Sequence, residues 1–427
     1  MAAMPALVTP PLALYVHFPW CVRKCPYCDF NSYTLQGELP REPYLARLER
    51  DLAEQAGAVR GREIVSVFLG GGTPSLFPPE AIARVLAAAG AHLGLAPDAE
   101  VTLEANPGTI ERGRFAEYRA AGVTRVSLGA QSFDAATLAV LGRIHSPAET
   151  RRAAEELHAA GLTNFNLDLM YALPGQDPAG ALRDVEEALA LAPAHLSHYQ
   201  LTLEPGTVFA ARPPPLPDDD AAAAMLGACA ARLEAAGFGQ YEVSAWARPG
   251  AQCRHNLNYW TFGDYLGAGA GAHGKLTHAA AGELVRTTHV REPRRYLAAR
   301  APTPRTVSAT ERPFEFMLNA LRLTAGFQPQ LFAERTGLAW ESIRTPLAAA
   351  EARGLLLCTP SGCRPSSLGL RFLNDLLLEF LPEMPEKSYV SVLSTPTSAA
   401  AAGHARGLYS QALNGSSKNE RITRETG

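Results

Sequence analysis

Three cysteines lie close together near the start of the chain, in the segment Cys21-Val22-Arg23-Lys24-Cys25-Pro26-Tyr27-Cys28. Thiolates at this spacing, directly after a predicted strand, can converge on one metal centre without help from distant residues. We expect each thiolate to bind one iron of a [4Fe–4S] cluster, so that the fourth iron has no protein ligand and can bind a small chelating molecule. Lys24 and Arg23 are expected to offset the negative charge of the thiolates.

Two other interpretations of these cysteines stay open. A structural zinc ion usually takes four protein ligands in two close pairs. No second pair follows at a suitable distance, and His17, which could be a fourth ligand, lies on the preceding predicted strand. Alternatively, the three cysteines are unrelated core residues. Among the remaining cysteines, Cys229 is expected in the core, and Cys358 and Cys363, which flank a turn, are expected as free thiols.

Polar side chains also gather near the ends of predicted strands. Glu104, Gln131 and Asp168 fall near the carboxyl ends of successive strands, where sites assemble in α/β barrels. The loop Gly70-Gly71-Gly72-Thr73-Pro74 closes a strand and exposes backbone amides that suit the polar groups of a small ligand. Arg143 follows the next helix and could pair with a carboxylate. Taken alone, each of these residues is equally well an ordinary polar residue at a barrel rim.

The elements that would position these residues alternate between strand and helix from residue 12 to about 205. This alternation predicts βαβ units with a parallel sheet and right-handed crossovers. Six such units would curl into a partial (β/α)6 barrel, and an open doubly wound sheet is the alternative. The predicted strands are 12–18, 64–69, 100–105, 125–130, 164–170 and 195–203, and the predicted helices are 42–59, 79–93, 111–121, 134–141, 147–160 and 178–191.

The chain divides into four predicted regions. Residues 12–210 form the barrel core. Residues 211–305 begin with a proline-rich linker and continue with a helix, a glycine-rich stretch and the aromatic motif described below. Residues 306–385 are predicted as a helical C-terminal domain whose helices and two short strands resemble a winged helix. Residues 386–427 lack periodicity and are predicted as a disordered tail.

The composition argues against several classes of protein. With 39 basic and 42 acidic residues, the formal net charge is −3, which disfavours a nucleic-acid-binding protein that relies on a broad basic field. No apolar run is long enough for a transmembrane helix, and the N-terminus lacks the basic start and cleavage site of a signal peptide. Seven cysteines, an odd number, do not make a disulfide framework. We therefore expect a cytoplasmic protein.

The cysteine motif resembles that of the radical S-adenosylmethionine (SAM) superfamily, and the resemblance covers roughly residues 12–381. Further stretches recur in the branch that contains anaerobic coproporphyrinogen III oxidase and its heme-chaperone paralogue. The resemblance implies a partial (β/α)6 barrel followed by a helical C-terminal domain. These stretches are Tyr15-Val16-His17-Phe18-Pro19-Trp20-Cys21, Gly70-Gly71-Gly72-Thr73-Pro74, Glu104-Ala105-Asn106-Pro107, Gly129-Ala130-Gln131-Ser132-Phe133, Leu141-Gly142-Arg143-Ile144-His145 and Asn166-Leu167-Asp168-Leu169-Met170.

The same resemblance implies which residues contact SAM. A carboxylate such as Asp168 would accept hydrogen bonds from the ribose hydroxyls, and Arg143 would hold the methionine carboxylate. The glycine amides would help to fix the amino group. The implied contact residues are Tyr15, Tyr27, Gly71, Gly72, Thr73, Glu104, Gln131, Arg143 and Asp168.

A second motif lies in the segment Cys253-Arg254-His255-Asn256-Leu257-Asn258-Tyr259-Trp260. Its pattern, His-Asn-x-x-Tyr-Trp, resembles the heme-binding signature of the chaperone. An imidazole can bind heme iron axially, and neighbouring Tyr and Trp rings can cover the macrocycle. A packed aromatic corner with a hydrogen-bonded histidine is the simpler alternative. Beside the cluster motif, we expect heme to be bound by His255, Asn256, Tyr259 and Trp260, with His255 as the iron ligand and Cys253 as a weaker candidate.

Two departures from the oxidase pattern bear on activity. Phe30 stands where the oxidase has a further cysteine, and only fourteen residues precede Tyr15, where the oxidase has a longer segment. We therefore expect a heme chaperone that binds a [4Fe–4S] cluster, SAM and heme and delivers heme to client apo-hemoproteins; whether it is an enzyme stays open.

The main alternative function is that of an oxygen-independent coproporphyrinogen III oxidase, which carries out radical oxidative decarboxylation. A radical modifier of tRNA, and a heme-binding module whose cluster is only structural, are further alternatives. No nucleic-acid partner is expected, while homodimer formation and peripheral membrane contact stay open.

Overall fold

The fold is described by a computed structural model that covers residues 5–108, 113–298 and 301–382. The predicted disordered tail, 386–427, lies outside these residues. One twelve-stranded sheet dominates the molecule, in the order β14-β13-β12-β11-β1-β4-β5-β6-β7-β8-β10-β9. Two-stranded sheets are formed by β2(Trp20–Cys21) with β3(Tyr33–Thr34) and by β15(Leu356–Thr359) with β16(Gly362–Pro365).

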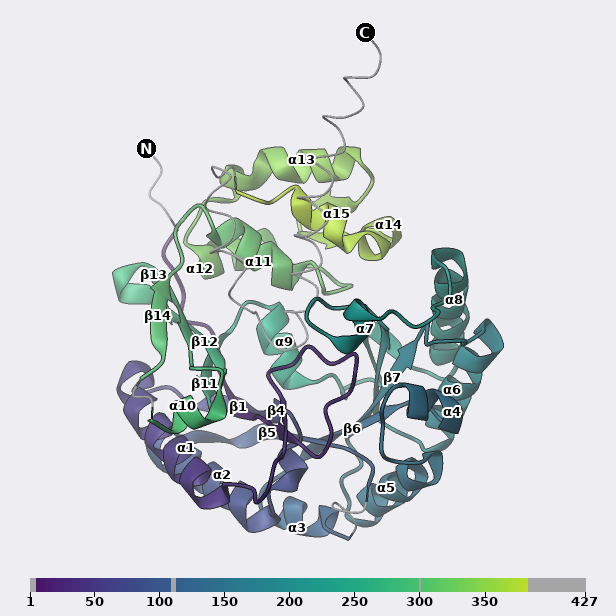
Figure 1. The fold of residues 1–427 in the computed structure, drawn as a ribbon. Helices are drawn as coiled ribbons and strands as arrows, with labels where there is room; N and C mark the ends of the chain where they lie inside the picture. The colour runs from purple at the N-terminus through teal and green to yellow at the C-terminus, as the bar shows by residue number, and fades with distance from the viewer. Residues whose placement is uncertain (1–4, 109–112, 299–300, 383–427) are drawn as a thin grey trace.

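Six neighbouring strands at the centre of the large sheet run parallel, as the sequence predicts. The helices that connect them curve around the outer side of the sheet (Figure 1), which confirms a partial barrel and not a doubly wound sheet. The strands are β1(Leu12–Phe18), β4(Ile64–Gly71), β5(Leu95–Ala105), β6(Arg125–Gln131), β7(Phe165–Tyr171) and β8(His195–Gln200), and the helices are α1(Arg41–Gln55), α2(Pro79–Leu93), α3(Phe115–Ala120), α4(Ala135–Val140), α5(Pro147–Ala159) and α6(Pro178–Ala190).

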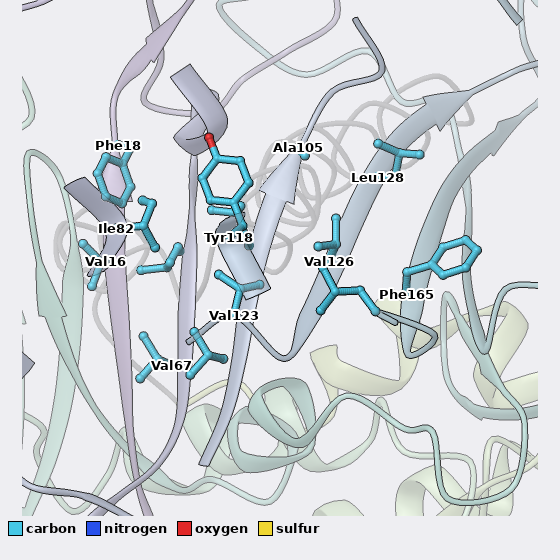
Figure 2. Close-up of a cluster of buried hydrophobic side chains, with 14 of the residues drawn as sticks. Val16, Phe18, Val67, Ile82, Ala105, Tyr118, Val123, Val126, Leu128 and Phe165 are labelled. Atoms are coloured by element: carbon cyan, nitrogen blue, oxygen red, sulfur yellow. The ribbon is translucent and has the colours of Figure 1, made fainter. Parts of the chain in front are cut away.

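Alternation along each strand separates an apolar face from a polar one. On β6, Val126 and Leu128 pack in the core, whereas Arg125, Ser127 and Gln131 line an internal cavity. Figure 2 shows the apolar side: residues of the strands meet side chains of α2 and α3. Because side chains on a strand point alternately to opposite faces, the same strands build both the core and the cavity wall.

Six further strands extend this sheet beyond the barrel, and the sequence analysis did not find them. On one side β10(Ala245–Ala247) pairs antiparallel with β8 and with β9(Gly239–Glu242). On the other side β11(Asp264–Ala268) pairs parallel with β1 and continues into the antiparallel strands β12(His273–His278), β13(Glu283–Thr288) and β14(Thr303–Thr306). Six strands of the sheet thus come from residues after Phe238.

The remaining elements lie outside the twelve-stranded sheet, and among them α8(Asp219–Ala235) packs against α6. None of the helices in the described ranges is long and apolar enough to cross a membrane. The helices are α7(Val208–Ala211), α8(Asp219–Ala235), α9(Arg254–Trp260) and α10(Pro293–Ala298), and the 3-10 turns are η1(Ala56–Val59), η2(Pro74–Leu76), η3(Ala279–Ala281) and η4(Trp340–Ile343).

The C-terminal region has a hydrophobic core of its own, in which Phe316, Phe327 and Phe332 pack edge to face. Three helices followed by a hairpin give it the order predicted from the winged-helix resemblance. It is joined to the barrel by an ion pair of 2.9 Å between Arg322 and Glu242 of β9, both buried. Its helices are α11(Arg312–Ala320), α12(Pro329–Thr336), α13(Arg344–Ala352), α14(Ser367–Arg371) and α15(Leu373–Leu378).

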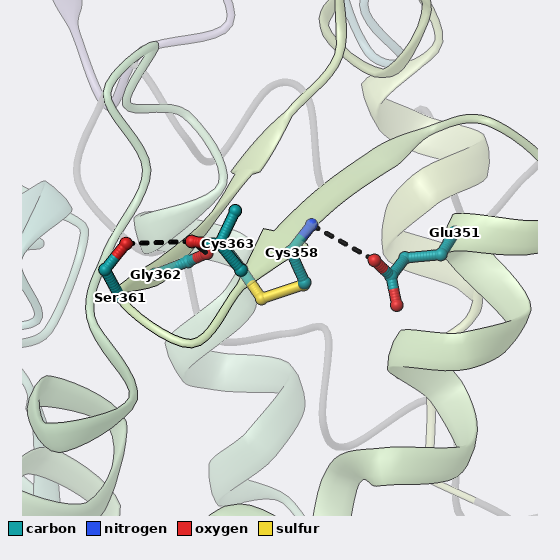
Figure 3. Close-up of a disulfide and its surroundings, with 6 residues drawn as sticks. Glu351, Cys358, Ser361, Gly362 and Cys363 are labelled. Atoms are coloured by element: carbon teal, nitrogen blue, oxygen red, sulfur yellow. Dashed lines mark hydrogen bonds between the residues drawn. A yellow bond between two sulfur atoms is a disulfide. The ribbon is translucent and has the colours of Figure 1, made fainter.

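The expectation of free thiols at Cys358 and Cys363 is wrong, because the two residues form a disulfide. They lie directly opposite each other in the β15–β16 hairpin, with 4.1 Å between their Cα atoms (Figure 3). The Glu351 carboxylate of α13 accepts a hydrogen bond of 3.1 Å from the Cys358 amide. The hairpin register, which the sequence does not give, brings the sulfurs together.

One crossing of the backbone fixes the start of the cysteine loop against the end of β4. The Gly72 amide donates to the Phe18 carbonyl and the Thr73 amide to the Trp20 carbonyl, each at 2.7 Å. A Cβ at Gly72 would lie 2.5 Å from the carbonyl oxygen of Trp20 and 2.8 Å from that of Phe18. Only glycine therefore allows the two chain segments to approach this closely.

We expect Gly72→Ala to lower the free energy of unfolding by about 1–3 kcal/mol, because the added methyl group meets backbone atoms that cannot rotate away. Gly227→Ala is the matched control: Gly227 lies in α8 and a Cβ there would meet nothing within 4 Å. The control should stabilise α8 slightly. Thermal and urea unfolding measure both effects, and equal stability of the two variants would contradict the backbone crossing described above.

Candidate functional site

The three motif cysteines line one internal cavity of about 440 Å³. Cys21 ends β2, where its carbonyl accepts a hydrogen bond of 2.8 Å from the Leu35 amide, and the Cys28 amide donates to the Cys25 carbonyl. All three thiols are half-buried. In the described part of the chain, no three His, Cys, Asp or Glu side chains are arranged around a single metal ion.

Positive charge reaches the thiols from Arg143, which the sequence analysis assigned to a different task. The Arg143 Nη1 donates to the Cys25 sulfur at 3.7 Å. Lys24 offsets thiolate charge in part, as expected, and it also donates through Nζ to the carbonyls of Phe30 and Ser32, each at 3.0 Å, which holds the loop in shape. Burial raises the pKa of the Cys28 thiol to about 11, although Lys24 lowers it in part.

These surroundings fit a [4Fe–4S] cluster held by three cysteines. Thiolates are the ligands that such clusters use, and iron would compensate the negative charge that burial disfavours at these positions. Cys28 also lies within 3.8 Å of the Ser32 hydroxyl, a further hydrogen-bonding group near the sulfurs. When bound, such a cluster supplies single electrons.

The expectation about the glycine amides is wrong. The Gly71 amide donates to the Glu104 carboxylate at 2.9 Å, and the amides of Gly72 and Thr73 donate to backbone carbonyls, so all three are already used. An amino group in its ammonium form has only donors and needs acceptors. The loop therefore allows a ligand to approach its backbone closely. The second carboxylate oxygen of Glu104, which the Gly71 amide does not use, is the acceptor left for an ammonium group.

The other predicted strand-end residues meet in this cavity. Asp168 accepts hydrogen bonds from Asn166 at 2.7 Å and from Ser127 at 3.2 Å. Burial raises the pKa of the Asp168 carboxyl, and burial together with the charge of Asp168 raises the pKa of Glu104 to about 7. The charge of Asp168 thus disfavours ionisation of Glu104 in the same cavity.

Gln131 ends β6 in an unusual backbone conformation. Its φ of 67° lies in the left-handed region, and the β6–β7 register shifts between Leu128 and Gln131. The Gln131 side chain accepts a hydrogen bond of 2.8 Å from the Tyr199 hydroxyl. Strained non-glycine residues of this kind often lie at functional sites, and Gln131 was predicted there.

Arg143 and two tyrosines complete the predicted set. Arg143 donates to Asn106 and, at 2.8 Å, to the Gly129 carbonyl, which leaves its buried Nε without a partner among the described residues. The Tyr15 hydroxyl donates to His17 at 2.9 Å, and Tyr27 lies against Phe209. Sequence reasoning missed Asn106 and Tyr199 as site residues, although Asn106 stands in a stretch quoted for the resemblance.

The aromatic motif lines the same cavity from its other end. Helix α9 carries it, and His255 bonds through Nδ1 to the Ser66 hydroxyl of β4 at 3.1 Å and through Nε2 to the Tyr259 hydroxyl at 2.9 Å. The residue is 1% exposed, and burial lowers the pKa of His255 to about 3, so the ring is neutral. Both ring nitrogens are therefore already partnered.

The remaining motif residues differ in their surroundings. The Trp260 ring lies under the Arg322 guanidinium, 4.4 Å from the ring centroid. Asn256 is only half-buried and its amide group hydrogen-bonds no residue in the described part of the chain. The Cys253 thiol is buried and lies 3.5 Å from the Glu100 carboxylate, which it faces as a donor.

Comparison with known proteins agrees with this arrangement. Residues 15–192 match the Radical SAM superfamily, and residues 307–372 match the HemN C-terminal domain. The chain is 50% identical over 375 residues to the heme chaperone HemW of Escherichia coli (strain K12), which covers 88% of this chain and 99% of that protein. It is 44% identical over 385 residues to HemW of Haemophilus influenzae (strain ATCC 51907 / DSM 11121 / KW20 / Rd), covering 89% and 100%.

A solved structure supports the fold. Coproporphyrinogen III oxidase (HemN) from Escherichia coli superposes with a TM-score of 0.75 over 87% of this chain and 90% of that chain, at 21% identity. This likeness concerns the fold alone, whereas the identity to the two chaperones extends over nearly their whole length. The chain therefore belongs to the HemW family of the radical SAM superfamily.

Proposed function

We propose that this protein is a heme chaperone, which binds a [4Fe–4S] cluster, SAM and heme and delivers heme to apo-hemoproteins in the cytoplasm. One observation carries the proposal: the cysteine loop and the His-Asn-x-x-Tyr-Trp motif line a single cavity. The identity to two HemW proteins over nearly their whole length supports it. Homodimer formation and contact with a membrane surface are not part of the proposal.

Cys21, Cys25 and Cys28 hold the cluster in this proposal, and SAM takes the iron that has no protein ligand. Glu104 accepts from the ammonium group through the carboxylate oxygen that the Gly71 amide does not use. Asp168 accepts from the ribose hydroxyls, and Arg143 donates to the methionine carboxylate through its unpartnered Nε. Tyr15, Tyr27, Gly71, Gly72, Thr73 and Gln131 complete the walls of this part of the cavity.

Heme binds at the other end, with His255 as the iron ligand. The Nδ1 bond to Ser66 orients the imidazole, as outer hydrogen bonds do for metal-bound histidines. Nε2 is the nitrogen left for iron, and the Tyr259 hydroxyl now occupies it. Iron therefore binds only after this hydroxyl moves away, while Trp260, Tyr259 and Asn256 contact the macrocycle.

The size of the cavity limits what it holds at one time. A volume of about 440 Å³ suits one drug-sized ligand. SAM at the cysteine end would leave little room for a whole macrocycle beside α9. SAM and heme therefore compete for the space of this cavity in the arrangement described here.

The oxidase is the alternative, and one assay separates it from the chaperone. Phe30 stands where the oxidase carries a further cysteine, and the likeness to the oxidase structure extends only to the fold. Anaerobically reconstituted protein should transfer heme to an apo-hemoprotein and leave coproporphyrinogen III unchanged. Formation of protoporphyrinogen IX would overturn the chaperone proposal.

Replacement of Cys25 by Ser should reduce iron and acid-labile sulfide after anaerobic reconstitution to a small fraction of the wild-type content, because one of three cluster ligands is lost. Cys229→Ser is the matched control, since Cys229 is buried in α8 away from the loop, and it should retain the full content. Iron and sulfide analysis measures both. A mononuclear metal in the wild-type protein would contradict the cluster assignment.

Because the Tyr259 hydroxyl occupies Nε2 of His255, removal of this hydroxyl should strengthen heme binding. Tyr259→Phe keeps the ring but removes the hydroxyl that competes for Nε2, so heme should bind about fivefold more tightly, as expected for a hydrogen bond of about 1 kcal/mol. His255→Ala should lose the axial-histidine spectrum. Tyr265→Phe, which removes a hydroxyl bonded to Arg286, is the control and should not tighten binding. Absorbance titration decides, and unchanged affinity in His255→Ala removes His255 as ligand.

The affinity for SAM should increase with pH through about pH 7. The pKa of Glu104 is raised to about 7; below that value the carboxyl is protonated and accepts poorly from an ammonium group. Each pH unit below the pKa should therefore cost up to about tenfold in affinity. Glu104→Gln should bind more weakly and show a flatter profile between pH 6 and 8. Equilibrium dialysis on the reconstituted protein provides the measurement.

A further inference from the structure

Arg125 is a buried cation whose guanidinium makes no direct hydrogen bond within the described part of the chain. It is the first residue of β6, it is 2% exposed, and it points into the cavity with Ser127 and Gln131. None of its guanidinium nitrogens makes a hydrogen bond or ion pair with a residue in the described ranges, and its Nε is fully enclosed. Arg322, in the same cavity, is by contrast paired with Glu242.

The acidic groups around Arg125 are already engaged elsewhere. Glu100 accepts from the His255 amide and from the Cys253 thiol. Asp168 accepts from Asn166 and Ser127. Glu100 and Asp168 therefore attract Arg125 at a distance, while its guanidinium donors stay free to hydrogen-bond a ligand.

Burial of the Arg125 guanidinium without direct hydrogen bonds is unfavourable. Burial disfavours the charged form of Arg125, and Cys253, Glu100 and Asp168 offset this by attraction, so that the pKa of Arg125 is raised, but none of them hydrogen-bonds the guanidinium directly. Deprotonation does not remove this charge, because an arginine side chain stays protonated in proteins. A ligand that brings negative charge would repay this cost on binding.

The surroundings specify the chemistry of that ligand. A planar guanidinium matches the two oxygens of a carboxylate, and the unpartnered amide of Asn256 lies in the same cavity as a second donor. Glu100 and Asp168 lie near enough to act electrostatically on Arg125. One cation among these acids suits a monoanion better than a doubly charged phosphate.

We propose that Arg125 is a carboxylate-binding residue at the α9 end of the cavity, where it receives a propionate of the porphyrin that the proposed function assigns to this site. The proposal in its porphyrin form rests on that function. The shared chemistry, a carboxylate on a buried arginine, does not, because a small free carboxylate would satisfy the same donors.

The test compares ferric heme with ferric heme dimethyl ester, in which both propionates are uncharged. The wild-type protein should bind heme about tenfold or more tightly than the ester, as a charged hydrogen-bonded pair would provide. In Arg125→Gln this ratio should fall to near one, through loss of heme affinity while affinity for the ester stays the same. Arg125→Lys, which keeps the charge but not the planar fork, should lie between.

Arg291→Gln is the matched control, because Arg291 lines the same cavity but is exposed. It should keep the wild-type ratio. A wild-type ratio near one, or a ratio that Arg125→Gln preserves, would overturn the proposal; the first readout needs no variant and holds even if Arg125→Gln misfolds. Circular dichroism checks folding of each variant.

A separate measurement distinguishes failure of this inference from failure of the proposed function. If the wild-type protein binds neither porphyrin, the heme function fails. The carboxylate site is then decided by thermal unfolding in sodium succinate against sodium chloride at equal ionic strength. Stabilisation of the wild type that is absent in Arg125→Gln supports the site, and equal response of the two proteins overturns it.

Discussion

The two-residue alternation of side chains along the six parallel strands is the constraint on which the rest of this structure depends. Each strand sends Val, Leu and Phe outward to the helices and polar residues inward. A shift of one residue would exchange the two faces and place charges in the core. The alternation therefore determines which polar residues face the interior as strictly as it determines the hydrophobic core. The residues available to bind a cofactor are positioned by the same alternation that stabilises the fold.

The interior has two ends with different residues. At the carboxyl ends of the strands, the backbone crossing at Gly72 holds the cysteine loop over the cavity, and Arg143 brings positive charge to it. At the opposite end, α9 closes the barrel with His255 bonded to Ser66. In many α/β barrels this lower face contributes only stability. Here it carries the motif that sets this chain apart from a generic radical SAM protein.

Sequence reasoning succeeded where local pattern decides the structure. The six central strands and their helices follow from runs such as Leu12–Phe18 and from the proline and serine that begin α5. It missed strands such as β12(His273–His278), whose His, Gly and Lys residues have no strand signal and which form because β11 and β13 flank them. Contacts between distant segments decide such strands, and one sequence does not contain them.

The candidate site divides in the same way. The thiol of Cys21 and the carboxylates of Glu104 and Asp168 indicate binding of a metal or a polar ligand from the sequence alone. The structure places all three in one cavity. Their hydrogen-bond partners were not predictable: the glycine amides donate to groups of the protein itself, and Lys24, besides its charge effect on Cys28, donates to two loop carbonyls. Arg125 gave no signal, because an arginine at the start of a strand has no meaning until its neighbours are known.

Arg322 connects three parts of the molecule. It pairs with Glu242 of the edge strand β9, covers the Trp260 ring of α9, and comes from the C-terminal region just after α11. Cutting the chain before residue 307 would remove the cation that pairs with Glu242 and would uncover the Trp260 ring. The barrel therefore depends on the C-terminal region to neutralise one of its buried carboxylates and to cover one of its aromatic rings.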